Sequence, residues 1–210
     1  MTVTKDQIVK WLEKTAAVLG ENKEYLTQLD AAIGDADHGI NMNRGFRKVM
    51  EKLPTVADKD IGNILKTTGM TLISSVGGAA GPLYGTFYLR SGMAVPAKME
   101  LNNDDLVKML QAGVDGIVQR GRPEFDDKTM YDAWAPAMKA LSAAVANGDD
   151  QVAALRSAVA AAEQGMKDTI PLQASKGRAS YLGERSIGHQ DPGATSSYLI
   201  LNALLETIEG

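Results

Sequence analysis

Apolar residues recur at three- to four-residue spacing along most of the chain, which is the period of one face of an α-helix. Clear stripes of this kind begin at Ile8, Ile61, Leu106, Trp134, Val152 and Tyr198. Runs with the two-residue alternation of half-buried strands are absent, and the β-branched residues lie inside the helical stripes. Thr4 followed by Gln7 has the spacing of a helix-capping box just before the first stripe. The pattern predicts an all-α protein of about eight helices.

Size and composition narrow the class of protein. With 210 residues, 44% of them apolar, and a net charge of −4, the chain has the composition of one ordinary globular domain over residues 1–210. The absence of cysteine excludes disulfide scaffolds, thiol nucleophiles and cysteine-ligated metals. Mild acidity argues against nucleic-acid binding, and no apolar run reaches the ~18 residues that span a bilayer. Because Lys5, Asp6 and Glu13 interrupt the region where a signal peptide is apolar, we expect a cytoplasmic protein that does not enter membranes.

Glycine is unevenly distributed along the chain. Eleven of the 21 glycines fall in three short segments, residues 34–45, 77–85 and 177–193. Both histidines, His38 and His189, lie in the first and third of these segments. One interpretation is a set of surface turns, and the other is a set of loops that together form a site.

Three carboxylates within eight residues, Asp30, Asp35 and Asp37, lie just before and at the start of the first glycine segment. Like charges this close repel one another, and Mg²⁺ is the simplest partner because it prefers carboxylate and phosphate oxygens. Aspartates are also common as helix caps and in turns. Gly34 and His38 beside them favour the metal site. A calcium-binding EF-hand that starts at Asp35 is excluded, because its sixth position is not glycine and its twelfth is not glutamate.

The other two segments have features of phosphate-binding loops. Residues 74–85 are small and lead to Pro82, so they predict either an anion-binding helix start or a tight helix corner. Residues 175–196 lack helical periodicity, and a loop that long is usually functional. It ends with Asp191 and Pro192, typical of a helix N-cap and first position, and its Arg178 is a candidate partner for phosphate or a solvated surface residue. Walker A and Gly-x-Gly motifs are absent.

Taken together, these motifs resemble the L subunit of dihydroxyacetone kinases from the first helix to the last. The matching segments are Asp30, Gly34–Gly39, Ser75–Ala79, Asp127–Met130, Lys176–Tyr181 and His189–Ala194. The resemblance implies an antiparallel barrel of eight helices, with the nucleotide bound in the loops at one end. Ala80 stands where this family usually has a serine, so its contact with the nucleotide is expected to be through the backbone alone.

The resemblance also implies roles for individual residues. Two Mg²⁺ ions are expected on Asp30, Asp35 and Asp37, bridging to the phosphates of ADP or ATP. Arg178 is expected to stabilise phosphate charge, and no covalent nucleophile is implied on this chain. The nucleotide contacts that the resemblance carries over are His38, Gly39, Ile40, Asn41, Ala79, Ala80, Gly121, Met130, Arg178, Asp191, Pro192 and Gly193.

By the same resemblance, we expect the nucleotide half of a phosphoenolpyruvate-dependent phosphotransferase. ADP stays bound as a coenzyme and is rephosphorylated in place by a phosphohistidine-carrying subunit of the phosphotransferase system. The phosphoryl group then passes to dihydroxyacetone on a separate K subunit. Three alternatives stay open: a nucleotide-state sensor that binds a transcription regulator, the L part of an ATP-dependent kinase with freely exchanging ATP, and a helical metal-binding scaffold without turnover.

Overall fold

The computed structural model describes residues 2–210 and is mostly helical. Its nine α-helices are α1 (Lys5–Glu21), α2 (Lys23–Ile33), α3 (His38–Lys52), α4 (Ile61–Ser75), α5 (Ala80–Ala94), α6 (Asn103–Gly121), α7 (Tyr131–Ala146), α8 (Gln151–Asp168) and α9 (Pro192–Glu209). Shorter elements are the 3-10 helices η1 (Leu53–Thr55) and η2 (Arg178–Ser186) and the strands β1 (Val3–Thr4) and β2 (Glu100–Leu101). The all-α prediction is confirmed.

Two details differ from the prediction. Residues 2–210 hold nine α-helices rather than about eight, because α1 and α2 are separate helices with only Asn22 between them. The long third glycine segment is not structureless, since η2 lies inside it. In α3, Met42, Phe46 and Val49 are buried at helical spacing within an otherwise polar sequence. The packing of these three side chains against the core therefore stabilises this helix.

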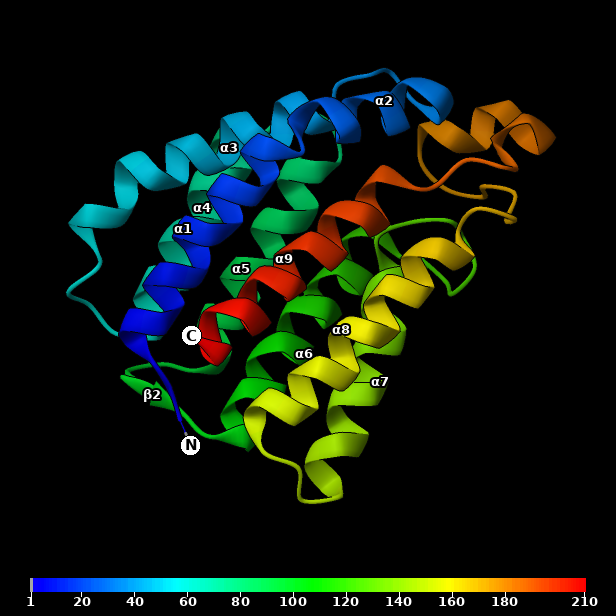
Figure 1. The fold of residues 1–210 in the computed structure, drawn as a ribbon. Helices are drawn as coiled ribbons and strands as arrows, with labels where there is room; N and C mark the ends of the chain where they lie inside the picture. Colours follow the sequence, from blue (N-terminus) through cyan, green and yellow to red (C-terminus); the bar gives the residue numbers. More distant parts are fainter. Residues whose placement is uncertain (1) are drawn as a thin grey trace.

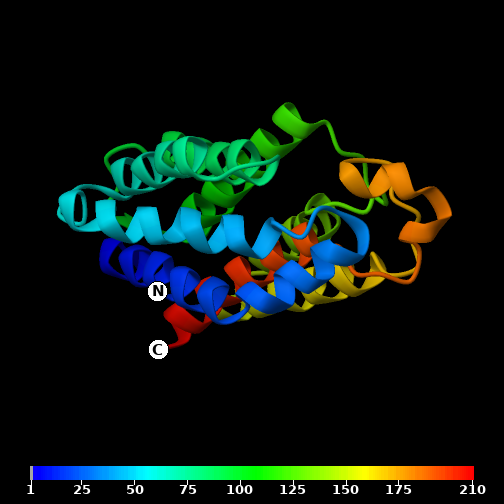
Figure 2. The same ribbon diagram turned by 90° about the horizontal axis from the view of Figure 1, so that it is seen from above.

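The helices pack side by side in chain order, and α9 returns to lie against α1 and α8 (Figures 1 and 2). A continuous apolar core runs along the inside of the bundle, with Trp11, Phe87, Tyr88 and Trp134 fully or almost fully buried. The rings of Phe87 and Trp134 stack with their centroids 4.7 Å apart. Large aromatic rings therefore fill the middle of the molecule, and a ligand-sized cavity lies toward one end.

Some glycines of the second segment belong to a helix and not to a loop. Gly85 lies inside α5, where an added Cβ would come 2.4 Å from the Ile73 side chain and 2.8 Å from the Gly69 carbonyl oxygen of α4. The two helix backbones approach this closely because neither residue carries a side chain. Glycine in this chain therefore serves helix packing as well as loop formation.

One end of the bundle is held together by the connection between α5 and α6, residues 95–102. The backbone amides of Lys5 and Ile61 donate hydrogen bonds to the carbonyls of Met99 and Lys98, both at 2.8 Å, and β2 pairs with β1. The helices α1, α4, α6 and α8 begin here, and both chain termini lie at this end (Figure 1). We call it the tied end, and we call the opposite end, where α3, α5, α7 and α9 begin, the open end. In residues 2–210, no helix combines the length and apolarity needed to cross a membrane.

Candidate functional site

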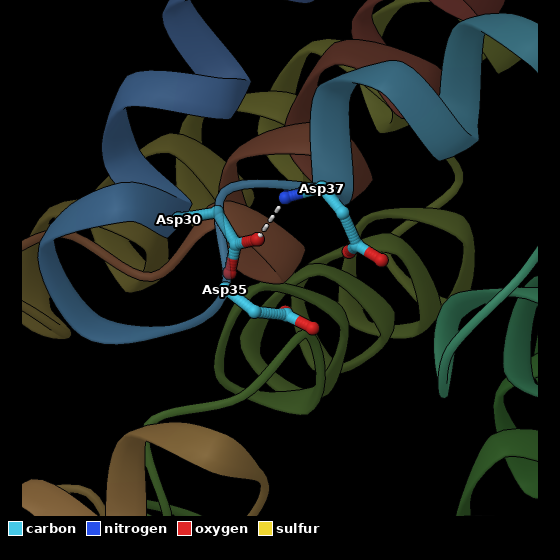
Figure 3. Close-up of side chains that lie close together, drawn as sticks. All are labelled: Asp30, Asp35 and Asp37. Carbon is cyan, nitrogen blue, oxygen red and sulfur yellow. Dashed lines mark hydrogen bonds between the residues drawn. The ribbon is translucent and has the colours of Figure 1, made fainter.

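The three carboxylates singled out in the sequence meet at the open end, in the last turn of α2 and the short loop before α3. Asp30, Asp35 and Asp37 each place one carboxylate oxygen within 4.8 Å of the others (Figure 3). Asp30 is buried, and its Oδ2 accepts hydrogen bonds from the backbone amides of Asp37 at 2.8 Å and His38 at 3.1 Å. Those two bonds fold the loop back over the end of α2, so that all three carboxylates share one face.

The backbone of this loop fits the cluster closely. A Cβ on Gly34 would stand 2.0 Å from Oδ1 of Asp30, so any side chain at position 34 displaces the buried carboxylate. Ala36, between the two other aspartates, has a φ of +61°, which is strained for a residue with a side chain. Three oxygen donors with an accessible face are the ligand set that Mg²⁺ takes, with its other positions filled by water or phosphate. The residues present therefore fit the metal that the sequence implied.

Beside the carboxylates, the starts of α3 and α5 are suited to anions. Neither Asp37 nor Ala79, their N-cap residues, makes a side-chain hydrogen bond to the first turn of its helix. Helix N-termini carry backbone N–H groups without intrahelical partners and the positive pole of the helix dipole. A phosphate group placed here is therefore stabilised by the backbone while the carboxylates hold its counter-ion.

A cavity of about 330 Å³ joins these elements at the open end. Its walls bring together most of the sequence-predicted residues: Asp30, Asp35, Asp37, His38, Asn41, Ala79, Ala80, Gly121, Met130, Arg178, Asp191, Pro192 and Gly193. Gly39 and Ile40 are not part of the wall. Gly39 packs α3 against α2, since its Cβ would lie 2.0 Å from the Lys23 carbonyl oxygen, and Ile40 is 45% exposed on the surface.

His38 is held in place by a buried polar network. Its Nε2 lies 2.8 Å from Oγ of Ser196, which lies 2.6 Å from the hydroxyl of Tyr84. Tyr84 also donates to the carbonyl of Gly193 at 3.0 Å. Burial lowers the pKa of His38 to about 4 against the opposing effect of Asp30 and Asp37, so the ring is neutral at pH 7. The network fixes the start of α3 to α5 and to the first turn of α9.

The start of α9 follows the sequence prediction. Asp191 is the N-cap residue, its Oδ2 accepts from the Ala194 amide at 2.7 Å, and Pro192 is the first helical residue. Burial raises the pKa of Asp191 to about 7, because it outweighs the capping hydrogen bond and the nearby charge of Lys128. Asp191 is thus a buried acid at the cavity wall and not a solvated cap.

Arg178 lies at the rim of the cavity. Its Nε is 2.9 Å from Oδ2 of Asp35, and its side chain is 68% exposed. The guanidinium is therefore within reach of the carboxylate cluster, where the positive charge of an arginine complements both carboxylate and phosphate groups.

Several residues of the site were not among those predicted from the sequence. Gly77, Gly78, Lys128, Thr129, Lys176 and Gly177 also line the cavity. Lys128 and Thr129 belong to the motif Asp127–Met130 that was already noted, so the motif itself was an available signal. Tyr84 and Ser196 gave no local signal, because their roles depend on contacts between α3, α5 and α9.

Comparisons with known proteins identify the family of the chain. The family model described as "DAK2 domain" matches residues 32–206. The "PEP-dependent dihydroxyacetone kinase, ADP-binding subunit DhaL" of Escherichia coli is 53% identical over 97% of both chains. The "PTS-dependent dihydroxyacetone kinase, ADP-binding subunit DhaL" of Lactococcus lactis is 39% identical over 98% of this chain and 99% of its own.

A solved structure shows the same fold within a longer chain. The dihydroxyacetone kinase of C. freundii in complex with AMP-PNP and Mg²⁺ matches with a TM-score of 0.70 and 25% identity, covering 95% of this chain and 33% of that one. Its native form matches with a TM-score of 0.72. The chain therefore belongs to the DAK2-domain family and, within it, to the ADP-binding subunits of dihydroxyacetone kinases.

Proposed function

We propose that this chain holds ADP and two Mg²⁺ ions at the open end as a resident coenzyme, and that it relays phosphoryl groups. A phosphohistidine-carrying subunit of the phosphotransferase system rephosphorylates the ADP in place. The phosphoryl group then passes to dihydroxyacetone on a separate K subunit. The observation that carries this proposal is the juxtaposition of three carboxylates with the uncapped start of α5, in the wall of a cavity of about 330 Å³.

The wall of the cavity divides into a phosphate side and a nucleoside side. Asp30, Asp35 and Asp37 would hold the metal, and the amides that begin α5 would bind phosphate oxygens. Mg²⁺ bound there supplies positive charge that neutralises the phosphate oxygens during transfer. Farther along the wall, the buried Met130 offers an apolar surface for the base, beside Gly121.

Catalysis by this chain then consists of positioning and charge stabilisation, which phosphoryl transfer chiefly requires. Arg178 is free to leave Asp35 for a phosphate oxygen, because both partners of its ion pair lie at the exposed rim. His38 is neutral and bonded to Ser196, so it orients the first turn of α3 without adding charge. No side chain of the site is needed as a covalent nucleophile.

Support for the donor and the partners comes from the relatives. Relatives that cover nearly the same length are named PEP-dependent or PTS-dependent ADP-binding subunits. In the C. freundii kinase the matching part is about a third of the chain. Because the relatives of nearly the same length are named as subunits, we infer that the substrate-binding part is a separate subunit here. We also interpret the closed order of the helices, in which α9 returns to α1, as the antiparallel eight-helix barrel of this family.

Bound nucleotide is the first measurement. The purified protein, after extensive gel filtration without nucleotide, is analysed by mass spectrometry of the native protein and of its acid extract. We expect ADP and Mg²⁺ to stay with the chain in stoichiometric amounts. Free exchange of the nucleotide with the buffer contradicts the coenzyme role and favours the ATP-dependent alternative.

Turnover is the second measurement. The chain is mixed with a substrate subunit, the phosphohistidine donor and dihydroxyacetone, and dihydroxyacetone phosphate is measured. We expect product that depends on every component, with the chain's nucleotide acting catalytically. Tight ADP binding without any product favours the nucleotide sensor that binds a transcription regulator.

A further inference from the structure

A buried lysine lies at the cavity wall without a carboxylate beside it. Lys128 is 1% exposed, and among residues 2–210 it is the one lysine or arginine that is buried. No carboxylate lies within 4.0 Å of its ammonium in the described part of the chain. Burying a charge without a partner costs folding free energy. The groups that form hydrogen bonds with the ammonium therefore indicate its role.

The ammonium of Lys128 is satisfied by backbone carbonyls just beyond the end of α8. Its Nζ donates to the carbonyls of Thr169 at 2.8 Å, Leu172 at 3.0 Å and Ile170 at 3.4 Å. Three carbonyls match the three N–H donors of an ammonium. The C-terminus of a helix also carries the negative pole of its dipole, so a positive charge is stabilised there.

The residues around Lys128 extend this link to two other walls of the cavity. The backbone carbonyl of the neighbouring Asp127 accepts a hydrogen bond from the backbone amide of Ser175 at 3.2 Å. This bond holds the segment that leads to Arg178. Thr169 accepts from the backbone amide of Asp191 at 3.0 Å through its Oγ1. Three segments that line the cavity, 128–130, 176–178 and 191–193, are therefore linked by hydrogen bonds of Lys128, of its neighbour Asp127 and of Thr169, whose carbonyl Lys128 binds.

The charge of Lys128 is electrostatically coupled to this junction as well. Burial lowers the pKa of Lys128, and the nearby Asp191 opposes that effect. The backbone of Lys128 has a φ of +62°, a conformation that is strained for any residue with a side chain. A glycine would remove the strain but would lose the ammonium that joins the segments.

We propose that Lys128 is a positioning residue for the nucleotide. By binding the carbonyls of Thr169, Ile170 and Leu172, it holds the three cavity segments in the arrangement that binds ADP. This inference rests on the proposed binding of ADP at the open end. Lys128 acts through Met130, Arg178 and Asp191 to Gly193, and none of its own hydrogen bonds reaches the carboxylate cluster.

The test compares two substitutions of Lys128 with a matched one at the tied end. Lys128→Met keeps the length of the side chain without any donor, and Lys128→Gln keeps one amide donor group. Gln151→Met is the control, because the buried Gln151 makes the same kind of bond, from Nε2 to the Leu101 carbonyl at 2.9 Å, far from the cavity. Binding of ADP is measured calorimetrically on nucleotide-stripped protein, and binding of Mn²⁺ alone by electron paramagnetic resonance.

We expect Lys128→Met to weaken ADP binding by about tenfold or more, the effect of losing a charge-assisted hydrogen bond. The ADP affinity of Lys128→Gln should lie between those of Lys128→Met and the unchanged chain. The Mn²⁺ affinity should stay the same in both variants. Gln151→Met should leave both affinities unaltered. Equal ADP affinity in Lys128→Gln and the unchanged chain overturns the proposal, and so does a parallel loss of ADP and Mn²⁺ binding, which indicates general unfolding.

Hydrogen exchange of the nucleotide-free protein tests the positioning role of Lys128 independently of ADP binding. The Gly188 amide also reports on this junction, because it donates to the Ile170 carbonyl at 2.8 Å. In Lys128→Gln, the amides of Ser175, Gly188 and Asp191 should exchange faster, while those of α1 and α4 keep their protection. Unchanged exchange at the three amides overturns the positioning role even if ADP binds. If the unchanged chain binds no ADP, the proposed function fails, and faster exchange still shows that Lys128 joins the segments.

Discussion

The two ends of the helical bundle begin their helices differently. At the tied end, all four helices have an N-cap side chain bonded to the first turn: Thr4, Asp60, Asn102 and Asp150. At the open end, Asp191 is the one N-cap residue of the described chain whose own side chain makes such a bond. The first amides of α3 and α7 donate instead to side chains outside the helix, Asp30 and Thr129, while no side-chain bond caps the start of α5. A cap satisfies the free N–H groups that an anion would otherwise bind. The tied end therefore uses its helix starts for stability, and the open end leaves the start of α5 for a ligand.

Backbone strain follows the same division. Residues other than glycine with positive φ in the described chain are Ala36, Ala97, Arg122, Asp126 and Lys128. All except Ala97 lie in the loops of the open end. Such conformations persist only where the surroundings hold them, and they are frequent at functional sites. The open end thus contains most of this backbone strain, and bound metal and nucleotide would stabilise the folded chain by mass action.

The largest expected effect comes from removing one charge of the carboxylate cluster. We expect Asp35→Asn to lower the rate of dihydroxyacetone phosphate formation by about a thousandfold, because it weakens the metal that neutralises phosphate charge. The rate is measured in the reconstituted system with saturating partners. The matched control is Asp104→Asn, which removes an exposed acidic group from the first turn of α6 at the tied end.

If Asp35→Asn lowers the rate only slightly, as Asp104→Asn does, this contradicts the assignment of ligand binding to the open end and of stability to the tied end. It would leave the helical metal-binding scaffold without turnover as the better interpretation of the cluster. Binding of Mn²⁺ to the same variant shows directly whether the metal is lost.

Local sequence signals predicted some parts of this site and not others. The capping box of Thr4 and Gln7 and the Asp191–Pro192 helix start are encoded within four residues, and both are confirmed. The carboxylate cluster was predictable because its members lie within eight residues of one another. The role of Met130 came only from the family resemblance, since its own pattern is that of a core residue.

Other features depend on segments that are far apart in the chain. The bond between Tyr84 and Ser196 joins residues 112 apart, and that between Lys128 and Thr169 joins residues 41 apart. The sequence places Gly85 in a glycine-rich loop segment, whereas in the structure it lies in α5 and packs against the backbone of Gly69. No periodicity or spacing predicts such contacts, because the packing of whole helices decides them.

The two aspartate caps should respond to pH in different ways. Burial raises the pKa of Asp191 to about 7, so its folded form binds a proton more tightly than the unfolded chain does. Its contribution to the free energy of unfolding is therefore full below about pH 4 and is lost as the pH rises toward 7, a change of a few kcal/mol. At Asp60, burial pushes the pKa up, but hydrogen bonds from Asn63 outweigh it and the pKa is lowered.

Thermal unfolding of Asp191→Asn and Asp60→Asn between pH 4 and 7 measures this contrast. We expect the Tm of Asp191→Asn, relative to the unchanged chain, to rise steadily with pH. The corresponding difference for Asp60→Asn should stay flat, because its titration lies below this range. His38 contributes a pH dependence of its own, because its lowered pKa makes stability rise with pH over the same interval. Taking the difference in Tm between each variant and the unchanged chain removes this contribution. A flat difference for Asp191→Asn contradicts a buried acid at this position.

A negative charge at the start of α5 should make the open end resemble the tied end. Ala79 is exposed at the N-cap of α5, and Ala79→Asp places a carboxylate at the positive pole of the helix. We expect ADP to bind about tenfold more weakly at low salt, because the carboxylate repels the phosphates, while the Tm of the nucleotide-free protein does not fall. The control Ala79→Asn has a similar shape without the charge. Equal losses of affinity in both variants would show that the side chain blocks the site by size alone.

The smallest effect is expected from removing a cap at the tied end. The Oδ1 of Asp150 accepts a hydrogen bond from the Ala153 amide at 2.8 Å, and Asp150→Ala leaves that amide to water. The free energy of unfolding should drop by about 1 kcal/mol, the usual value for an N-cap, measured by urea denaturation. ADP affinity should be unaltered, because the tied end lies at the opposite end of the helices from the cavity. If ADP binding weakens along with stability, the two ends are coupled through the helices and do not divide stability and binding between them.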